Sequence, residues 1–202
     1  MFDNSAARFV IGVDEAGRGP LAGPVVAAAC VLQGEIPAGL NDSKKLTAKR
    51  RATLDEKLRA GDHAFSICVV EPEEIDRVNI FQATMLAMTR CVADLVARLG
   101  GEPEEVLIDG NQTPHNRCPE WRWQARAIVG GDGKEAAISA ASILAKEHRD
   151  RLMVAAAKDH PHYGWERNKG YGTAEHMEAL RIHGPTRLHR QSFAPVAQAV
   201  LL

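Results

Sequence analysis

The sequence predicts an α/β fold in which a mixed sheet is flanked by helices. Short apolar, β-branched runs dominate the first part of the chain, and long helical periods alternate with short strand patterns after them. Hydrophobic residues make up 45% of the 202 residues and charged residues 25%, which is ordinary for a globular protein with a sizeable core. Together these observations favour one large domain with a helical appendage.

Five segments have the pattern of strands. They are mainly apolar runs, and glycine, proline or polar residues bound them. They cover residues 8–13, 24–32, 63–70, 105–108 and 125–129. The chain begins with strands and continues with alternating helices and short strands. This order favours a mixed sheet covered by helices.

Four segments are predicted to be helical. The first begins at Thr47 as its N-cap and ends before Gly61, and the second covers residues 79–99, where apolar side chains recur every four positions. The third runs from about residue 135 to 157 and opens with small residues, which allow close packing against a sheet. The fourth runs over about 173–183 and ends at a Gly-Pro pair.

Composition excludes several classes of protein. The formal net charge of −1 argues against a histone-like polyanion binder, although a segregated surface charge still allows nucleic-acid binding. The 4 cysteines form no C-x-x-C pair, so we expect neither a zinc ribbon nor a disulfide framework. The start of the chain lacks the features of a signal peptide, and no uninterrupted apolar stretch is long enough for a bilayer. We therefore expect a cytoplasmic protein without a membrane partner, and a monomer.

Two adjacent carboxylates end the first predicted strand and precede a glycine-rich loop. Asp14 and Glu15 follow an apolar run, where acidic side chains are costly unless a cation meets them. The following Gly17-Arg18-Gly19 offers exposed backbone N–H groups and a guanidinium, which suit a phosphate. The chain has neither G-x-x-x-x-G-K-[ST] nor a G-x-G-x-x-G that opens a βαβ unit, so a nucleotide-kinase loop is not expected.

Two further carboxylates follow later apolar runs. Asp109 comes directly after a short strand, and Asp132 lies between another strand and the third helix. Strand ends and helix starts converge in α/β sheets, and acids that meet there repel one another until divalent cations compensate them. Carboxylate oxygens suit Mg²⁺ or Mn²⁺. Two such ions can stabilise both the attacking and the leaving oxygen when a phosphodiester is cleaved. Taken singly, however, an Asp before Gly is most often a turn residue, and Glu135 competes with Asp132.

A basic segment and an aromatic segment each allow two interpretations. Lys44 and Lys45 lead into the first helix, which is itself basic, so the segment either follows a phosphate backbone or is a solvated surface. Residues 160–173 interleave aromatic, basic and glycine residues, and their rings either stack on bases and sugars or pack on one another. His160 and His162 flank a proline without acids nearby, so we do not expect zinc there.

These motifs resemble the type 2 ribonucleases H, specifically the bacterial ribonuclease HII family. The resemblance spans most of the chain, and its first and fourth blocks are long and highly specific. The first block is Gly-Val-Asp-Glu-Ala-Gly-Arg-Gly-Pro-Leu-Ala-Gly-Pro-Val. The blocks cover residues 12–25, 42–46, 108–110, 138–146, 168–173 and 183–193.

The resemblance implies a ribonuclease H-like fold, with a catalytic domain over residues 1–157 and a helical C-terminal segment over 158–202 that contributes to substrate binding within the same unit. It implies endonucleolytic hydrolysis of the RNA strand in RNA–DNA hybrids. It also implies incision 5′ of a single ribonucleotide embedded in duplex DNA. Two Mg²⁺ or Mn²⁺ ions would assist, leaving 3′-hydroxyl and 5′-phosphate ends.

The resemblance also assigns residues. The catalytic and metal-binding acids are Asp14, Glu15, Asp109 and Asp132. The substrate-binding residues are Gly17, Arg18, Gly19, Lys44, Lys45, Ser142, Lys146 and Tyr171. Within this set the glycine-rich loop senses the 2′-hydroxyl through backbone contacts, and Tyr171 stacks on the deoxyribose at an RNA–DNA junction.

The chain departs from the family pattern at three places. Asn168 stands where the family has histidine, Glu147-His148 replaces Val-Thr, and Gly130 replaces a basic residue. None of them is an expected acid ligand, so we expect changes in substrate-binding strength and not in activity. One rival is ribonuclease HIII, which carries an extra N-terminal domain and is disfavoured because the first strand starts within ten residues. The other is a catalytically silent hybrid-binding module, which would not need four acids.

Overall fold

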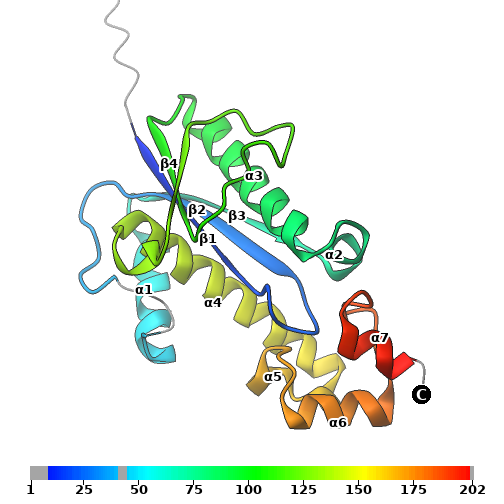
Figure 1. Cartoon of the computed structure of the whole chain (residues 1–202). Coiled ribbons are helices and arrows are strands. Elements are labelled where there is room, and N and C mark those ends of the chain that lie inside the picture. The colour runs from blue at the N-terminus through cyan, green and yellow to red at the C-terminus, as the bar shows by residue number, and fades with distance from the viewer. Residues whose placement is uncertain (1–8, 41–44, 201–202) are drawn as a thin grey trace, which may run out of the picture.

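A computed structural model of the chain describes residues 9–40 and 45–200, and it contains a five-stranded sheet (Figure 1). The strands are β1 (Val10–Ala16), β2 (Val25–Val31), β3 (Ala64–Val70), β4 (Glu105–Asp109) and β5 (Ala125–Ile128). Their order is β3-β2-β1-β4-β5. β1 pairs antiparallel with β2 and parallel with β4, which confirms the predicted mixed sheet.

The first strand extends further than its sequence pattern indicates. Asp14 and Glu15 lie within β1 and not after it, because they pair with Ala28 and Ala27 of β2. The pattern ends early since it follows apolar residues, whereas the ladder of backbone hydrogen bonds continues through polar ones. Both carboxylates are therefore held on a regular strand inside the sheet.

Seven α-helices occur in the described part of the chain. They are α1 (Ala48–Ala60), α2 (Pro72–Val78), α3 (Ile80–Leu99), α4 (Ala136–Asp159), α5 (Trp165–Asn168), α6 (Ala174–His183) and α7 (Ala194–Val200). The four predicted helices are confirmed as α1, α3, α4 and α6. The sequence pattern misses α2, α5 and α7, because helices of seven residues or fewer contain too few apolar repeats to be recognised.

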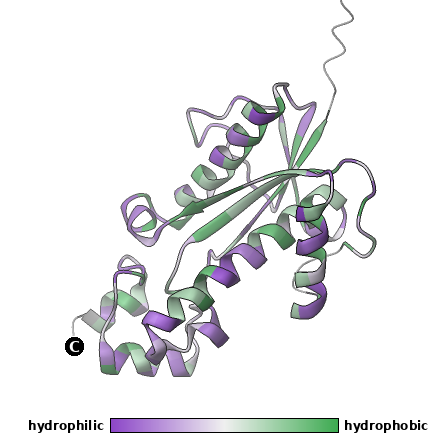
Figure 2. Cartoon of the chain, turned by 180° about the vertical axis from the view of Figure 1, so that it is seen from behind, coloured by the Kyte–Doolittle hydropathy of each residue, from purple (hydrophilic) through white to green (hydrophobic). Residues whose placement is uncertain are grey.

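The helices cover both faces of the sheet (Figures 1 and 2). α3 packs against β2 and β3, whereas α4 packs against β1 and β2, and α1 packs on α4. All of β2 is buried, and its side chains alternate between the two layers, with Ala27 in the core beside α3 and Ala28 in the core beside α4. The site-bearing strand β1 is thus held between two hydrophobic layers.

By length and mean composition, α3 could cross a membrane, and it is the single helix of the described residues with this property. Arg90 and Asp94 interrupt it, in agreement with the expectation that no uninterrupted apolar span exists. One side of α3 is buried in the core against β2 and β3. This is the usual composition of a core helix.

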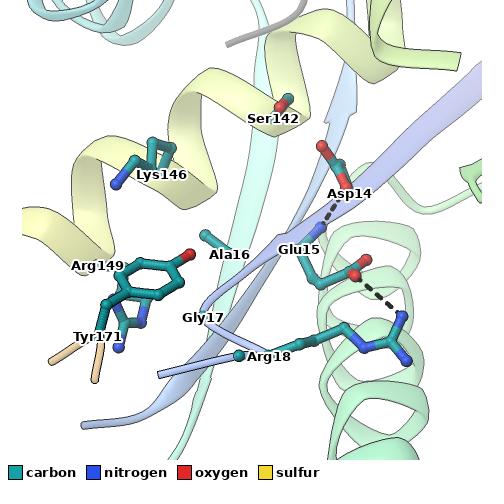
Figure 3. A pocket seen from close by; sticks show the side chains of 10 residues that line it. Asp14, Glu15, Ala16, Gly17, Arg18, Ser142, Lys146, Arg149 and Tyr171 are labelled. Atoms are coloured by element: carbon teal, nitrogen blue, oxygen red, sulfur yellow. Dashed lines mark hydrogen bonds and ion pairs between the residues drawn. The ribbon is translucent and has the colours of Figure 1, made fainter. Parts of the chain in front are cut away.

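β1 and α4 meet at a glycine. A Cβ atom on Gly12 would lie 2.1 Å from the carbonyl carbon of Ala137, so a side chain there would push the helix away from the strand. The small residues at the start of α4 permit this approach, as predicted. As a result the second turn of α4, with Ser142, lies beside Asp14 (Figure 3).

The C-terminal segment packs against the far end of α4 and the loop after β1. Tyr163 and Trp165 form a buried cluster with Met153 of α4 and Ala22. Ala22 also forms an isolated β-bridge with His189. α4 is continuous across residue 157, so the boundary between a catalytic domain and a C-terminal segment stays a prediction.

Candidate active site

A cavity of about 270 Å³ opens where β1 ends and the glycine-rich loop begins (Figure 3). β1, its loop, α4 and the loop before α6 supply its walls. The lining residues are Asp14, Glu15, Ala16, Gly17, Arg18, Gly19, Ser142, Lys146, Arg149 and Tyr171. The structure thus brings together eight of the twelve predicted site residues, although they come from three distant parts of the sequence.

Asp14 lies in an environment that opposes its ionisation. Its side chain is buried, and one oxygen accepts a hydrogen bond from the backbone N–H of Glu15 at 2.7 Å. Burial raises the pKa of Asp14 well above its usual range, and the negative charges of Glu15 and Asp109 raise it further. A hydrogen bond from the Ser142 side chain acts in the opposite direction. A divalent cation would relieve this accumulation of negative charge.

Glu15 projects from β1 toward the loop. Its carboxylate lies 3.5 Å from the guanidinium of Arg18, and Figure 3 shows this ion pair across the turn. The side chain of Arg18 is 51% exposed, so solvent weakens the pair. An incoming phosphate can therefore compete for Arg18 at little cost.

Asp109 is the last residue of β4 and Asp132 lies in a short 3-10 turn after β5, and neither lines the cavity. One oxygen of Asp109 accepts hydrogen bonds from the N–H groups of Gly131, at 2.7 Å, and Asp132, at 3.3 Å. Asp132 is buried, whereas Glu135 is half-buried and its charge acts on Arg126 of β5. Across the described ranges, no three acidic, histidine or cysteine side chains converge in a metal-binding group.

Two buried arginines, which sequence reasoning missed, hold the glycine-rich loop. Arg149 of α4 donates to the carbonyl oxygens of Ala22, Pro24 and Lys169 at 2.9–3.0 Å. Gly17 has φ +97°, and a Cβ atom there would lie 2.0 Å from Nε of Arg149. Burial lowers the pKa of Arg149 to about 10, so it remains charged at neutral pH.

Arg190 approaches the same loop from the C-terminal segment. It donates to the carbonyl oxygens of Gly23 and Arg18 at 2.9 Å and of Gly17 at 2.5 Å. Burial lowers the pKa of Arg190 to about 9. The sequence contained one weak indication of the role of Arg149. It follows Ser142 by two helical turns, so both residues lie on one face of α4.

The remaining predicted substrate residues are placed differently. Tyr171 is 48% exposed, and it lines the cavity together with Arg149 (Figure 3). Lys146 lines the cavity and pairs with Asp150 at 2.6 Å. Lys45 is exposed just before α1 and does not line the cavity, and Lys44 lies outside the described residues.

The aromatic segment divides between the two interpretations. Tyr163 and Trp165 are buried and stack on each other with ring centroids 5.0 Å apart, so they pack within the protein. His162 stacks on His183 with centroids 4.3 Å apart. Tyr171 alone of these rings lies at the cavity.

A protein-family model described as Ribonuclease HII matches residues 11–196. The chain belongs to the ribonuclease HII family. It is 67% identical over 192 residues to the ribonuclease HII of Erythrobacter litoralis, which covers 95% of this chain and 90% of that protein. It is also 67% identical over 194 residues to the ribonuclease HII of Novosphingobium aromaticivorans, covering 95% and 98% of the two chains. The predicted resemblance and the enzyme class, a metal-dependent ribonuclease H of type 2, are confirmed.

Solved structures share the fold. The ribonuclease HII of Archaeoglobus fulgidus, solved in complex with PCNA, superposes with a TM-score of 0.73 at 26% identity, covering 92% of this chain and 95% of that one. Bst-RNase HIII in complex with Mn²⁺ has a TM-score of 0.79 at 20% identity, covering 96% of this chain and 70% of that one. The predicted ribonuclease H-like fold is confirmed.

Proposed function

We propose that the protein hydrolyses the RNA strand of RNA–DNA hybrids and incises 5′ of single ribonucleotides embedded in duplex DNA. Its products would carry 3′-hydroxyl and 5′-phosphate ends. Membership of the ribonuclease HII family supports the action on hybrids. The observation that carries the proposal is one cavity in which the acids of β1, the glycine-rich loop and Tyr171 face the same space.

The acids fit a divalent metal chemically. Burial and the neighbouring charges of Glu15 and Asp109 already oppose ionisation of Asp14, which is the environment that a bound cation stabilises. The donors are carboxylate oxygens, which suit Mg²⁺ or Mn²⁺. We propose that Asp14, Glu15, Asp109 and Asp132 hold two such ions, for which Asp109 would leave its hydrogen bonds to the loop before α4. Bound ions would supply an activated water and neutralise the charge that develops on the phosphate.

The glycine-rich loop would read the sugar. Its carbonyl oxygens point toward Arg149 and Arg190, which act from inside the protein. Contacts with backbone groups of Gly17 and Gly19 can distinguish a 2′-hydroxyl from a hydrogen, because no side chain keeps the substrate away. The two buried cations beneath the loop also favour an approaching phosphate.

Tyr171 would read the junction. Its half-exposed ring borders the cavity, and a Cβ atom on Gly19 would lie 3.6 Å from that ring. A flat ring at this place can stack on the deoxyribose that follows the ribonucleotide. Lys146 and Ser142 line the wall between the ring and Asp14, where they can contact the backbone of the cleaved strand.

The test uses a DNA duplex that contains one ribonucleotide, with Mg²⁺ or Mn²⁺ added. We expect the wild-type protein to cut 5′ of the ribonucleotide, and Asp109→Asn to lose about 10²-fold or more in rate, the scale of losing one electrostatic stabiliser. Asp159→Asn, at the exposed end of α4, is the matched control and should cut normally. Binding of a hybrid without metal-dependent cleavage by wild type would instead support the silent binding module.

A further inference from the structure

A continuous chain of hydrogen bonds links the segment around Thr186 to the backbone of Tyr171 through two buried histidines. The N–H of Thr186 donates to Nδ1 of His189 at 2.9 Å. Nε2 of His189 lies 3.1 Å from Nε2 of His176, and Nδ1 of His176 lies 2.9 Å from the carbonyl oxygen of Tyr171. The proposed roles of the cavity residues do not use either ring.

The partners fix the proton positions on both rings. Nδ1 of His189 must accept, because a backbone N–H can only donate, so its proton lies on Nε2 and points at His176. Nε2 of His176 accepts hydrogen bonds from this N–H and from the indole N–H of Trp165, at 3.2 Å, and the two donors share its single lone pair. The remaining proton of His176 lies on Nδ1 and is donated to the carbonyl oxygen of Tyr171. Every bond in the chain then runs in one direction.

Both rings are neutral in this arrangement. They are fully buried, and burial lowers the pKa of His176 and lowers that of His189 to about 4. The titratable groups that act on them are His176 and His160, which oppose protonation of His189, and Glu175, which favours protonation of His176. A second proton on either ring would place two N–H groups face to face and break the chain.

The chain ends on a loop that is fixed on its other side as well. Asn168 accepts a hydrogen bond from the N–H of Gly170 at 2.9 Å, and the carbonyl oxygen of Gly170 accepts one from Leu21 at 2.8 Å. The carbonyl oxygen of Tyr171 accepts from Thr173 at 2.8 Å in addition to His176. The Tyr171 ring itself is half-exposed and faces the cavity. Its position therefore depends on how these backbone bonds hold the loop.

We propose that His176 and His189 are positioning residues that set the place of the Tyr171 ring, and thereby the recognition of the RNA–DNA junction. This inference rests on the proposed contact of Tyr171 with substrate. Neither histidine lines the cavity; His176 contacts the Tyr171 carbonyl oxygen directly, and His189 acts through His176. A ring displaced by one ångström stacks poorly on a sugar, so loss of the chain weakens substrate binding more than the chemical step.

The proton positions can be tested in the unmodified protein. Long-range ¹H–¹⁵N NMR spectra at neutral pH distinguish the two neutral forms of each histidine. We expect the proton of His176 on Nδ1 and that of His189 on Nε2. Finding the proton of His176 on Nε2 would overturn the inference, because that ring could not then donate to Tyr171.

The functional test is a double-mutant cycle between His176 and Tyr171 on the duplex with one ribonucleotide. We expect His176→Leu to raise KM by about tenfold with little change in kcat, and His176→Asn, which retains a donor near Nδ1, to recover part of the loss. In the Tyr171→Ala background, His176→Leu should have no further effect on KM. His183→Leu, an exposed histidine of the same helix, is the control.

The outcomes separate the two proposals. An equal effect of His176→Leu in both backgrounds would show a general structural role and overturn the inference alone. An unchanged KM for Tyr171→Ala would overturn the proposed substrate contact, and the inference with it. Thermal unfolding of each variant identifies those that fail to fold, and in that case the NMR result on the unmodified protein decides.

Discussion

Arg190 donates a hydrogen bond from Nη2 to the carbonyl oxygen of Gly17 at 2.5 Å, across 173 positions of sequence. Gly17 adopts φ +97°, and Arg149 occupies the space that a side chain would need. The loop that follows the acids of β1 is therefore shaped from inside by residues of α4 and of the C-terminal segment. Its conformation does not depend on the order of its own residues alone.

Replacing Arg190 with Met should destabilise the protein and weaken substrate binding. Three carbonyl oxygens, of Gly17, Arg18 and Gly23, would lose their donor in a buried place, and each unsatisfied group costs about 1–3 kcal/mol. Chemical denaturation measures the loss of stability, and KM on the single-ribonucleotide duplex measures the effect on the loop. Arg187→Met, at an exposed position nearby, is the control. A stable Arg190→Met protein with normal KM would contradict this role.

Replacing Gly12 with Ala should separate α4 from β1. The added Cβ atom would lie 2.1 Å from backbone atoms of Ala137, which cannot move aside without shifting the helix. We expect a loss of about 1–3 kcal/mol or more, as for other overpacked cores, together with reduced cleavage because Ser142 moves relative to Asp14. Gly101→Ala is the matched change, since its nearest contact is 3.4 Å away. Equal melting temperatures for the two variants would contradict the close approach.

The titration of Asp14 should move in opposite directions in two variants. Ser142→Ala removes a hydrogen bond that lowers the pKa of Asp14, so that pKa should rise. Glu15→Gln removes a negative charge that raises it, so the pKa should fall. Carboxyl ¹³C NMR of the metal-free protein follows both shifts. Shifts of the same sign would contradict the assigned electrostatics.

In the absence of metal, Asp14→Asn should be more stable than wild type at neutral pH. The pKa of Asp14 is raised in the folded protein above its ordinary value of 3.8. At any pH above 3.8 the ionised side chain therefore disfavours folding. Added Mg²⁺ or Mn²⁺ should raise the melting temperature of wild type and leave that of Asp14→Asn nearly unchanged. Calorimetry with and without the ions makes the comparison. An Asn variant that melts below the metal-free wild type would argue against repulsion at this site.

The buried His189 should make the free energy of unfolding decrease in mildly acidic solution. The pKa of His189 is about 4 in the folded protein against 6.5 unfolded, so the unfolded chain binds more protons between these values. The contribution of His189 to stability should therefore be constant above about pH 6.5 and fall as the pH approaches 4. Melting temperatures across this range test the prediction, and His189→Gln should flatten the slope. An equal pH dependence of the melting temperature in wild type and His189→Gln would contradict it.

Local patterns were enough to predict most of the architecture. Apolar runs located the five strands, an apolar repeat located α3, and cap residues, small residues and helix-ending glycines located α1, α4 and α6. Such patterns depend on residues close in sequence, so they can be read without knowing the fold. The extension of β1 through Asp14 could not be predicted in this way, because it depends on pairing with β2.

The site residues likewise fall into those that neighbour one another in sequence and those that only folding brings together. Asp14, Glu15 and the glycine-rich loop are adjacent in sequence, and their residue types alone indicated metal and phosphate chemistry. The gathering of Ser142, Lys146 and Tyr171 around them results from the packing of α4 and the C-terminal segment.

The motifs of the chain were therefore sufficient to predict its family. Folding added the buried cations Arg149 and Arg190 beneath the loop and the histidines behind Tyr171. A buried polar side chain acquires its role from partners that the fold places beside it, and no local pattern of residues specifies those partners.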